Sequence, residues 1–465
     1  MKRIILAVCA IVSVSVLQAS AQGKWGALTG GIQSDALWAQ GGNLYANNYL
    51  KLDYVNGRFS AGLQAEYYPN PLPGYAPEYK GIGLPGKYIA WQDKQWGITA
   101  GDFYDQLGTG LLFRSWEDRT LGWNNSLGGG RVTFCTQEHF FSIKALGGFR
   151  RRGLWYGNEV AGGAEASFQY NGFVLQGSAL VQKADTSFAW GWSALAGYEH
   201  GGFTARAEYV GRRRGNAQTL ELGYAAGKWS TTLTVRRLQQ MQDPMEMNYL
   251  PSLSMEQSYV LATMNPYTAF AEGELGASAD VYYRLKTWKF HVNGSWIWAL
   301  PSALKNHDVL RMAYRDANLQ VEKKWNRRVK TIAFVSIQEL SPSHGERNAT
   351  QAQNVFVLDG VYRFSRRLSV RSWIQYLYSQ ELTRDWMAFM LELSSTDGWS
   401  VHAQDMYNHG STKDHYYEAG ISWTHGGFKA DLTYGHQRAG LVCSGGVCRW
   451  QPEYTGGLLR LNYQF

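Results

Sequence analysis

The stretch YTGGLLRLNYQF, residues 454–465, ends in an alternation of apolar and polar side chains, from Leu459 up to a final phenylalanine. Successive side chains of a β-strand point to opposite faces, so a period of two is typical of a strand with one apolar and one polar surrounding. We therefore predict a strand that continues to the last residue. Its apolar face carries Leu459, Leu461, Tyr463 and Phe465, and its polar face carries Arg460, Asn462 and Gln464.

The first residues have the pattern of a secretory signal peptide. Lys2 and Arg3 form a positive start, residues 4–17 are apolar, and Ala19-Ser20-Ala21 offers small residues for cleavage. A membrane anchor is the alternative, but the run is short for a spanning helix, which needs about 20 residues. Lipidation at Cys9 is rejected because this cysteine lies inside the apolar run. We predict a signal peptide over residues 1–21 and an exported chain after it.

Composition favours a membrane β-barrel over soluble domains. Aromatic residues make up 14% of the chain, with 29 Tyr and 19 Trp, and there are 52 Gly, although mean hydropathy is only −0.34. Aromatic girdles and a polar lumen give a barrel this composition, whereas no apolar run beyond the leader is long enough for a spanning helix. Soluble β-domains are the alternative, but a linker between domains is missing. We predict one barrel domain over residues 22–465.

Short and long connections alternate along the chain. Eleven tight turns, among them Asn56-Gly57, Asn171-Gly172 and Asp397-Gly398, carry residues that accept the positive φ angles of hairpin turns. Twelve longer connections separate them, the longest being Gln242–Gly273 and Pro69–Gly86. The pattern predicts an all-β fold, a single transmembrane antiparallel up-and-down β-barrel of about 24 strands within a range of 20–24. Barrels of this kind have short periplasmic turns and long extracellular loops.

The closing strand resembles that of bacterial outer-membrane barrels, whose terminal aromatic residue is part of the signal read by the barrel-assembly machinery. The resemblance implies that Phe465 is an assembly signal and that the protein lies in the outer membrane. Its expected partners are then outer-membrane lipid, lipopolysaccharide and the assembly machinery.

Facing follows from the period of two within each predicted strand. Along residues 59–67 the odd positions are expected to meet lipid, and Ser60, Gln64 and Glu66 to face the lumen. Residues 164–170, 203–209 and 428–434 alternate in the same way. A Lys or Arg on the lipid face would cost about 2–4 kcal/mol at the membrane midplane, which selects this register.

Charged residues of both signs are expected in the lumen. Gly101–Arg131, GDFYDQLGTGLLFRSWEDRTLGWNNSLGGGR, crowds charges among glycines and aromatic residues and predicts a strand, an inward loop and a return strand. A network of paired charges that only supports the wall is the alternative to a permeation path. The candidate lumen or constriction residues are Asp102, Asp105, Arg114, Glu117, Asp118, Arg119, Arg131, Arg206 and Glu208.

Two arginine triplets lie where predicted strands meet long connections. They are Arg150, Arg151 and Arg152, and Arg212, Arg213 and Arg214. Guanidinium groups bind phosphate and carboxylate through paired hydrogen bonds, so the triplets are candidates for an anion-binding outer rim. A solvated loop edge is the alternative. The net charge of +8 favours anionic partners only weakly, and nucleic acid is not an expected partner of an exported barrel.

The cysteines agree with an oxidising compartment. Cys443 and Cys448 flank Gly445-Gly446 in the last long connection and are expected to form a disulfide. Metal binding by this pair is the alternative, but no second cysteine pair or histidine cluster accompanies it. Cys135 is left over near a predicted periplasmic turn.

The block Gly101–Arg131, the stretch Cys443–Arg449 and the terminal Phe465 together resemble a family of uncharacterised outer-membrane β-barrels of Bacteroidota. The likeness covers essentially the whole mature chain. It implies fold and location, and it brings no activity, catalytic residue or cofactor.

Function is expected to depend on the loops. The sequence lacks the GxSxG, HExxH, P-loop and dinucleotide-binding motifs, which disfavours an enzyme, and no cofactor or metal site is predicted. We expect a channel or transport protein for polar or anionic solutes, with access controlled by Pro69–Gly86, Arg114–Ser126 and Gln242–Gly273. The alternatives are a non-conducting scaffold with envelope protein partners in a secretion or surface-assembly complex, and a surface hydrolase for lipid or glycan.

Overall fold

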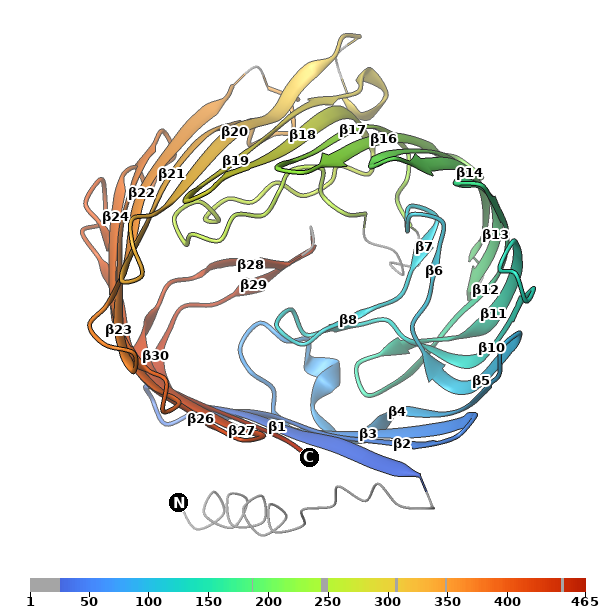
Figure 1. Ribbon diagram of the computed structural model, residues 1–465, viewed down its shortest axis with the longest axis horizontal. Coiled ribbons are helices and arrows are strands. Elements are labelled where there is room, and N and C mark those ends of the chain that lie inside the picture. Colours follow the sequence, from blue (N-terminus) through green and yellow to red (C-terminus); the bar gives the residue numbers. More distant parts are fainter. Residues whose placement is uncertain (1–25, 186, 244–249, 306–307, 348, 445–446) are drawn as a thin grey trace.

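A computed structural model describes residues 26–185, 187–243, 250–305, 308–347, 349–444 and 447–465. The chain forms a closed, antiparallel, up-and-down β-barrel of 24 strands, which confirms the predicted fold class and strand number (Figure 1). The wall strands are β1 (Ala27–Ala39), β2 (Leu44–Asn56), β3 (Phe59–Asn70), β4 (Gly81–Gln92), β5 (Trp96–Phe103), β10 (Leu127–Cys135), β11 (Phe141–Arg152), β12 (Trp155–Tyr170), β13 (Phe173–Ala184), β14 (Ser187–His200), β15 (Phe203–Arg212), β16 (Asn216–Ala226), β17 (Trp229–Gln239), β18 (Gly273–Leu285), β19 (Trp288–Ala299), β20 (Arg311–Lys324), β21 (Val329–Leu340), β22 (Gln351–Arg363), β23 (Leu368–Ser379), β24 (Trp386–Ser395), β25 (Trp399–Asn408), β26 (His415–His425), β27 (Phe428–Gln437) and β30 (Tyr454–Gln464).

The last strand closes the barrel, as its alternation indicates. β30 pairs with β27 on one side and with β1 on the other, where Gly31 is opposite Gln464. Two backbone hydrogen bonds of 3.0 Å join Gly30 and Phe465, so pairing continues to the terminal residue. The predicted signal peptide, residues 1–21, lies outside the described residues.

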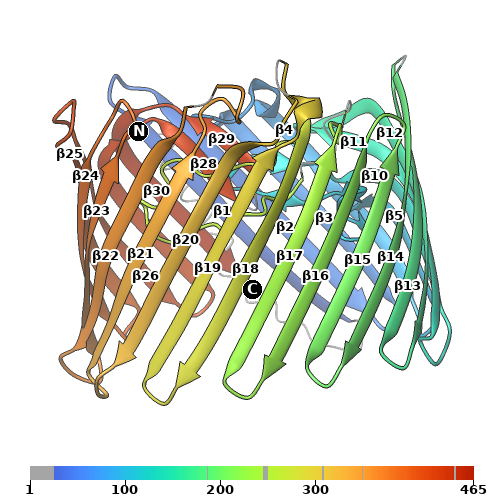
Figure 2. The same cartoon turned by 90° about the horizontal axis from the view of Figure 1, so that it is seen from above.

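All eleven predicted tight turns join neighbouring strands at one end of the barrel (Figure 2). Gly57 and Gly172 adopt positive φ angles of 59° and 83°, as these turns require. The long connections leave the opposite end. The long connection that the sequence predicts beside the first arginine triplet, Arg150–Glu159, needs correction, because it is not a long loop. Gly153, with φ of 56°, turns β11 directly into β12, so both strands extend beyond the expected boundary.

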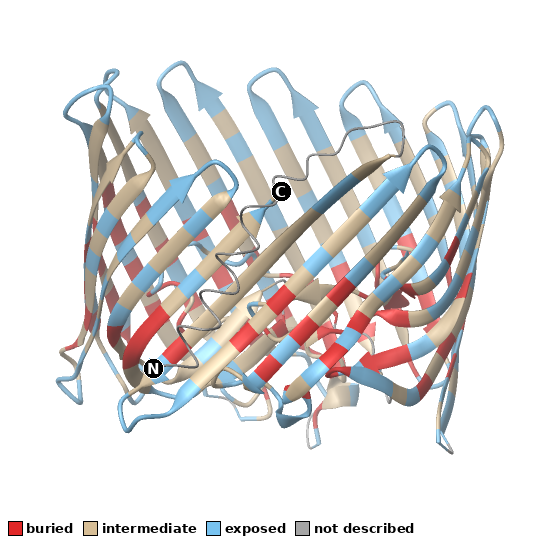
Figure 3. Ribbon diagram, turned by 90° about the horizontal axis from the view of Figure 1, so that it is seen from below, coloured by how far each residue is buried: buried red, intermediate tan, exposed pale blue. Residues whose placement is uncertain are grey.

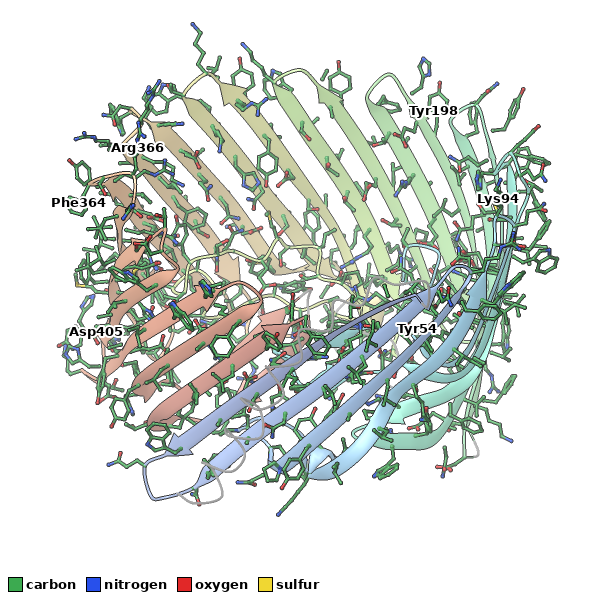
Figure 4. All side chains as sticks on the ribbon, turned by 60° about the horizontal axis from the view of Figure 1, so that its bottom comes forward. Tyr54, Lys94, Tyr198, Phe364, Arg366 and Asp405 are labelled. Atoms are coloured by element: carbon green, nitrogen blue, oxygen red, sulfur yellow. A yellow bond between two sulfur atoms is a disulfide. The ribbon has the colours of Figure 1, made fainter. Side chains whose placement is uncertain are left out.

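The outer surface carries an apolar band between two groups of aromatic side chains. In β3 the predicted facing holds, since Phe59, Leu63 and Tyr67 are exposed and Gln64 and Glu66 are buried. Aliphatic side chains form the middle of the band, among them Ile98, Val132, Leu175, Leu233, Val292, Leu358, Leu391 and Ile421. Exposed aromatic side chains near the short turns include Tyr170, Phe173, Trp229, Trp288 and Phe364, and those near the long connections include Trp38, Trp155, Phe188 and Tyr434. Figure 4 shows Phe364 and Arg366 at the short-turn rim. This distribution is that of a wall surrounded by lipid.

Burial is uneven along the barrel axis. Buried residues gather in the half from which the long connections leave, whereas the short-turn half is mostly exposed (Figure 3). Within the described residues no helix is long and apolar enough to cross a membrane. The two short helical turns, η1 (Pro77–Tyr79) and η2 (Pro301–Ala303), lie in long connections.

Four connections reach into the ring as far as the structure describes them, and they fill the long-loop half of the lumen (Figure 1). One is the predicted Pro69–Gly86 connection with η1, where Tyr75 and Tyr79 pack on Tyr49 and Tyr68 of the wall. The other three are longer or reach further across the lumen. We name them the first, second and third inward segments: residues 104–126, residues 240–272 and residues 438–453. The first contains β6 (Gln106–Leu107), β7 (Phe113–Arg114), β8 (Glu117–Asp118) and β9 (Trp123–Asn124), and the third contains β28 (Gly440–Ser444) and β29 (Val447–Gln451).

Candidate functional site

The first inward segment has a hydrophobic core of its own against the wall. Leu107, Leu112 and Phe113 are fully buried and pack with inward residues of β11 to β17. Glycines in the wall make room for them, because a Cβ on Gly163 or Gly191 would lie 2.8 Å from Leu107 or Leu112. Burying a large apolar side chain stabilises by about 1.5–3 kcal/mol, so this segment is firmly held.

Charged groups fix the same segment to the wall. Asp105 forms ion pairs with Arg131 at 3.0 Å and with Lys144 at 2.9 Å, and Lys144 continues to Glu165 at 3.1 Å. The Glu208 carboxylate accepts hydrogen bonds from the backbone and hydroxyl of Thr109. Asp105, Arg131 and Glu208, all predicted as lumen residues, therefore serve here to hold the inward segment.

The strand β8 carries two further predicted residues, Glu117 and Asp118, and Arg119 follows it directly. Asp118 accepts backbone hydrogen bonds from Thr120 and Leu121 and so shapes a turn. Arg119 pairs with Glu117 at 3.4 Å, donates to Gln33 at 3.1 Å and lies over the ring of Tyr49 at 4.3 Å. These contacts join β8 to the wall at β1 and β2.

The second inward segment crosses a wide part of the lumen on apolar contacts. Tyr259, Leu261, Ala262 and Met264 pack on inward residues of β21 to β25. Near its end, Glu274 of β18 pairs with Arg236 at 2.7 Å and accepts hydrogen bonds from Tyr267 and Phe270, both at 2.9 Å. Sequence reasoning missed the contact of the second inward segment with β21 to β25. The signal for it is the run Val355-Phe356-Val357-Leu358, which is apolar on both faces. One face meets lipid, and the other needs an apolar partner inside the lumen.

The third inward segment is a hairpin closed by the Cys443–Cys448 disulfide, which is present as expected. Its main polar attachment is Arg449, which donates to the backbone oxygens of Thr120 at 2.9 Å and Pro73 at 3.0 Å. Gly74 is required beside it, because its φ is 88° and a Cβ there would lie 2.2 Å from the Arg449 guanidinium. Leu441 and Trp450 stay exposed. This segment therefore has much less apolar anchoring than the other two.

Replacing both cysteines by serine should loosen this hairpin and leave the barrel intact. Closing a loop as short as the one between Cys443 and Cys448 stabilises by about 2 kcal/mol in the chain-entropy description. We expect faster proteolysis within residues 438–453, measured on the purified protein, with little change in the global unfolding temperature. Cys135→Ser is the control, and the protease should cleave it within residues 438–453 at the wild-type rate. An unchanged rate in the double variant would contradict this role.

Two cavities border the inward segments. The larger, about 590 Å³, lies between the first and second segments and the lumen faces of β13 to β18, and Arg206, Glu208, Glu221 and Arg236 line it. The smaller, about 200 Å³, lies where all three segments meet, with Arg114, Ser252 and Cys443 among its lining residues. Arg206 is exposed to the larger cavity, and Arg114 contributes to the smaller one.

Asp102 lies elsewhere than predicted. Its neighbour Phe103 faces the inner core, so Asp102 points to the outer face of the wall, where Lys87 lies 3.6 Å away and Tyr156 donates a hydrogen bond of 2.5 Å. Strand alternation thus removes Asp102 from the lumen.

The arginine triplets are also less exposed than a docking rim requires. Arg151 is buried and pairs with the buried Glu66 at 2.7 Å, and Arg150 and Arg152 pair with Glu159. Arg212 is directed inward to Asp243 and to the Leu112 oxygen. Arg213 and Arg214 remain exposed. The inward members serve the inner structure because strand alternation and the β11 bulge turn them toward carboxylates of distant segments.

His344, in the connection after β21, contacts the end of the second inward segment. Its ring stacks on Phe270 with centroids 4.7 Å apart. Burial lowers the pKa of His344, while the nearby Glu272 and Glu274 oppose the shift. Among the described residues, no group of three or more His, Cys, Asp or Glu side chains could hold a metal ion.

Acidification should therefore weaken the contact between His344 and the second segment. Because the folded-state pKa is below the unfolded value of about 6.5, the contribution is complete above that value and is lost as pH falls through the folded pKa. We expect amide exchange in residues 266–272 to accelerate between pH 7.5 and 5, relative to His344→Phe, which cannot be protonated. Identical pH profiles for both proteins would contradict the prediction.

A closed barrel with an apolar outer band and a lumen filled by its own loops is a transmembrane β-barrel of the outer-membrane type. The chain belongs to DUF6029, a family of unknown function, whose model matches residues 1–465. No curated protein sequence matches the chain. The expected affiliation with Bacteroidota stays a prediction.

Solved structures with a similar fold come from outer-membrane proteins. The E. coli P pilus tip assembly intermediate PapC-PapD-PapK-PapG has a TM-score of 0.55 at 12% identity, covering 94% of this chain and 60% of that chain. The P pilus usher (PapC) translocation pore has a TM-score of 0.49 at 12% identity, covering 94% and 99%. The copper transporter OprC has a TM-score of 0.47 at 10% identity, covering 95% of this chain and 81% of that chain. At 12% identity the likeness to the assembly intermediate shows the fold alone.

Proposed function

We propose that this protein is an outer-membrane channel or transport protein for polar or anionic solutes, and that its inward segments control passage. The short turns then face the periplasm and the long connections face outside. Lipid and lipopolysaccharide surround the apolar band, and Phe465 serves the assembly machinery as the terminal aromatic signal.

One observation carries the proposal: a wide barrel is filled in one half by segments of its own chain and is open in the other. A structural scaffold needs no lumen, whereas a regulated path needs a lumen and a removable obstruction. Large barrels need such a filling to restrict passage. The third inward segment is the best candidate for the movable part, because Arg449 and the small hairpin have few apolar contacts to lose.

Planar-bilayer recordings test this proposal. The purified protein is compared with a variant in which a short Gly-Ser linker replaces residues 440–451. The control is a variant in which the connection between β25 and β26 is shortened at its exposed residues 411–414. We expect several-fold higher conductance for the hairpin variant and wild-type conductance for the control. If neither the wild type nor the hairpin variant conducts, the channel proposal fails.

A non-conducting scaffold for surface assembly is the second candidate. It draws on the fold similarity to the pilus tip assembly intermediate, which is weak support at 12% identity. The scaffold predicts that envelope proteins co-purify with the barrel in mild detergent. Isolation of the barrel alone, together with measurable conductance, would favour the channel.

A further inference from the structure

Arg114 is held at the meeting point of the three inward segments. It ends β7, which pairs with β6 so that Arg114 is opposite Gln106. The buried Asn125 donates a hydrogen bond of 3.1 Å to the Arg114 carbonyl oxygen and fixes the backbone there. The guanidinium carbon lies 4.9 Å from the ring centroid of Trp116. The position of this side chain is thus set by the fold of the first segment.

The Arg114 guanidinium has no anionic partner among the described residues. Its Nε and Nη2 atoms are buried and lack hydrogen-bond acceptors. Two arginines of this lumen that are more deeply buried do have carboxylate partners, Arg151 with Glu66 and Arg236 with Glu274, both at 2.7 Å. Arg114 as a whole is half-buried, and covering part of a cation without giving it a partner is unfavourable, so a bound anion would stabilise it. The Trp116 ring offsets only part of this cost.

The cavity beside Arg114 has the size and chemistry for a small anionic group. Its volume is about 200 Å³, which is below the range of about 300–1,000 Å³ for sites that enclose whole drug-sized ligands. Ser252, Ser254, Thr263 and Asn265 supply hydroxyl and amide groups, and the disulfide of the third segment closes one side. One carboxylate, Glu256, also lines the cavity and disfavours anions at its own end.

Arg114 lines the cavity with a positive charge that no described carboxylate balances, and a guanidinium N–H forms strong charge-assisted hydrogen bonds to a carboxylate or phosphate oxygen. We propose that Arg114 and the 200 Å³ cavity at the junction of the inward segments form a recognition site for the oxyanion group, carboxylate or phosphate, of small solutes. This site rests on the proposed channel function and specifies its solute class. Exposed Arg213 and Arg214 lack such a cavity and serve as comparisons.

Binding is measured on the detergent-purified full chain and does not require conductance. Inorganic phosphate and succinate are titrated separately at constant ionic strength, while tryptophan fluorescence and unfolding temperature are recorded for the wild type, Arg114→Gln, Arg114→Lys and Arg213→Gln. We expect saturable binding of at least one of the two anions by the wild type and Arg213→Gln. Affinity should fall at least ten-fold in Arg114→Gln, with a smaller loss in Arg114→Lys, which keeps the charge.

The outcomes separate the site from the channel. Equal affinities in the wild type and Arg114→Gln, or no saturable response to either anion, would overturn the recognition site even if the barrel conducts. Binding lost in Arg114→Gln supports the site even if the barrel does not conduct, and the channel proposal then fails alone. Without anion, Arg114→Gln should unfold at or above the wild-type temperature, because an unpaired, half-buried charge has been removed. An unfolding temperature well below wild type would show that Arg114 is structural, and would also overturn the proposal.

Discussion

Replacing Phe113 by alanine is expected to destabilise the first inward segment by about 3–5 kcal/mol, because the ring is fully buried and the wall cannot collapse onto the space it leaves. The wall strands keep their own ladders, so the barrel should stay folded while residues 104–126 detach more often. Amide exchange measured by mass spectrometry should accelerate in this segment by at least a hundred-fold, which corresponds to about 2.7 kcal/mol.

Phe364→Ala is the matched control for this prediction. The ring of Phe364 is exposed at the short-turn rim (Figure 4) and touches none of the inward segments in the core clusters. Its replacement should leave exchange in residues 104–126 at the wild-type rate. If residues 104–126 of Phe113→Ala also exchange at the wild-type rate, the first inward segment is not held by its apolar core.

Replacing Glu66 by glutamine should strongly destabilise the barrel. Glu66 accepts from Arg151 at 2.7 Å and from Tyr68 at 2.7 Å, and both members of the ion pair are almost fully buried. Leaving one buried charge without its partner costs about 3–5 kcal/mol. Unfolding temperature and denaturant midpoint of the purified barrel should both fall.

Two further variants make the test specific. Glu66→Gln combined with Arg151→Met removes both charges and should recover much of the loss, since well-packed apolar residues replace a buried pair at little cost. Glu339→Gln breaks the pair with the exposed Arg315 and should change stability by at most about 1 kcal/mol. Equal losses of stability in Glu66→Gln and Glu339→Gln would contradict the prediction that the buried ion pair matters more than the exposed one.

Local chemistry explains what the sequence predicted well. Turns such as Asn56-Gly57 and Asn171-Gly172 encode their backbone angles within two residues, and alternation in strands such as 59–67 encodes facing, so strand number and orientation follow. The Cys443–Cys448 disulfide is similarly local.

The interior depends on partners that are distant in sequence. Arg151 was predicted at an exposed rim, but it is buried against Glu66, which lies 85 residues away in the sequence. The position of Arg449 is set by oxygens of Thr120 and Pro73, more than 300 residues earlier. Asp102 was assigned to the lumen because it lies in a charged block, and only the strand register with Phe103 facing inward turns it outward. Pairing between loops is not encoded by period or spacing.

Access of a thiol reagent to the lumen tests the central claim most directly. In a Cys135→Ser background, a membrane-impermeant maleimide is added outside intact cells that carry Thr234→Cys, in the larger cavity, or Arg213→Cys, at the rim. We predict that Thr234→Cys reacts at least ten-fold more slowly than Arg213→Cys, and that replacing residues 440–451 by a short linker accelerates labelling at position 234 but not at position 213. Equal labelling of position 234 with and without the hairpin would contradict control of passage by the third inward segment.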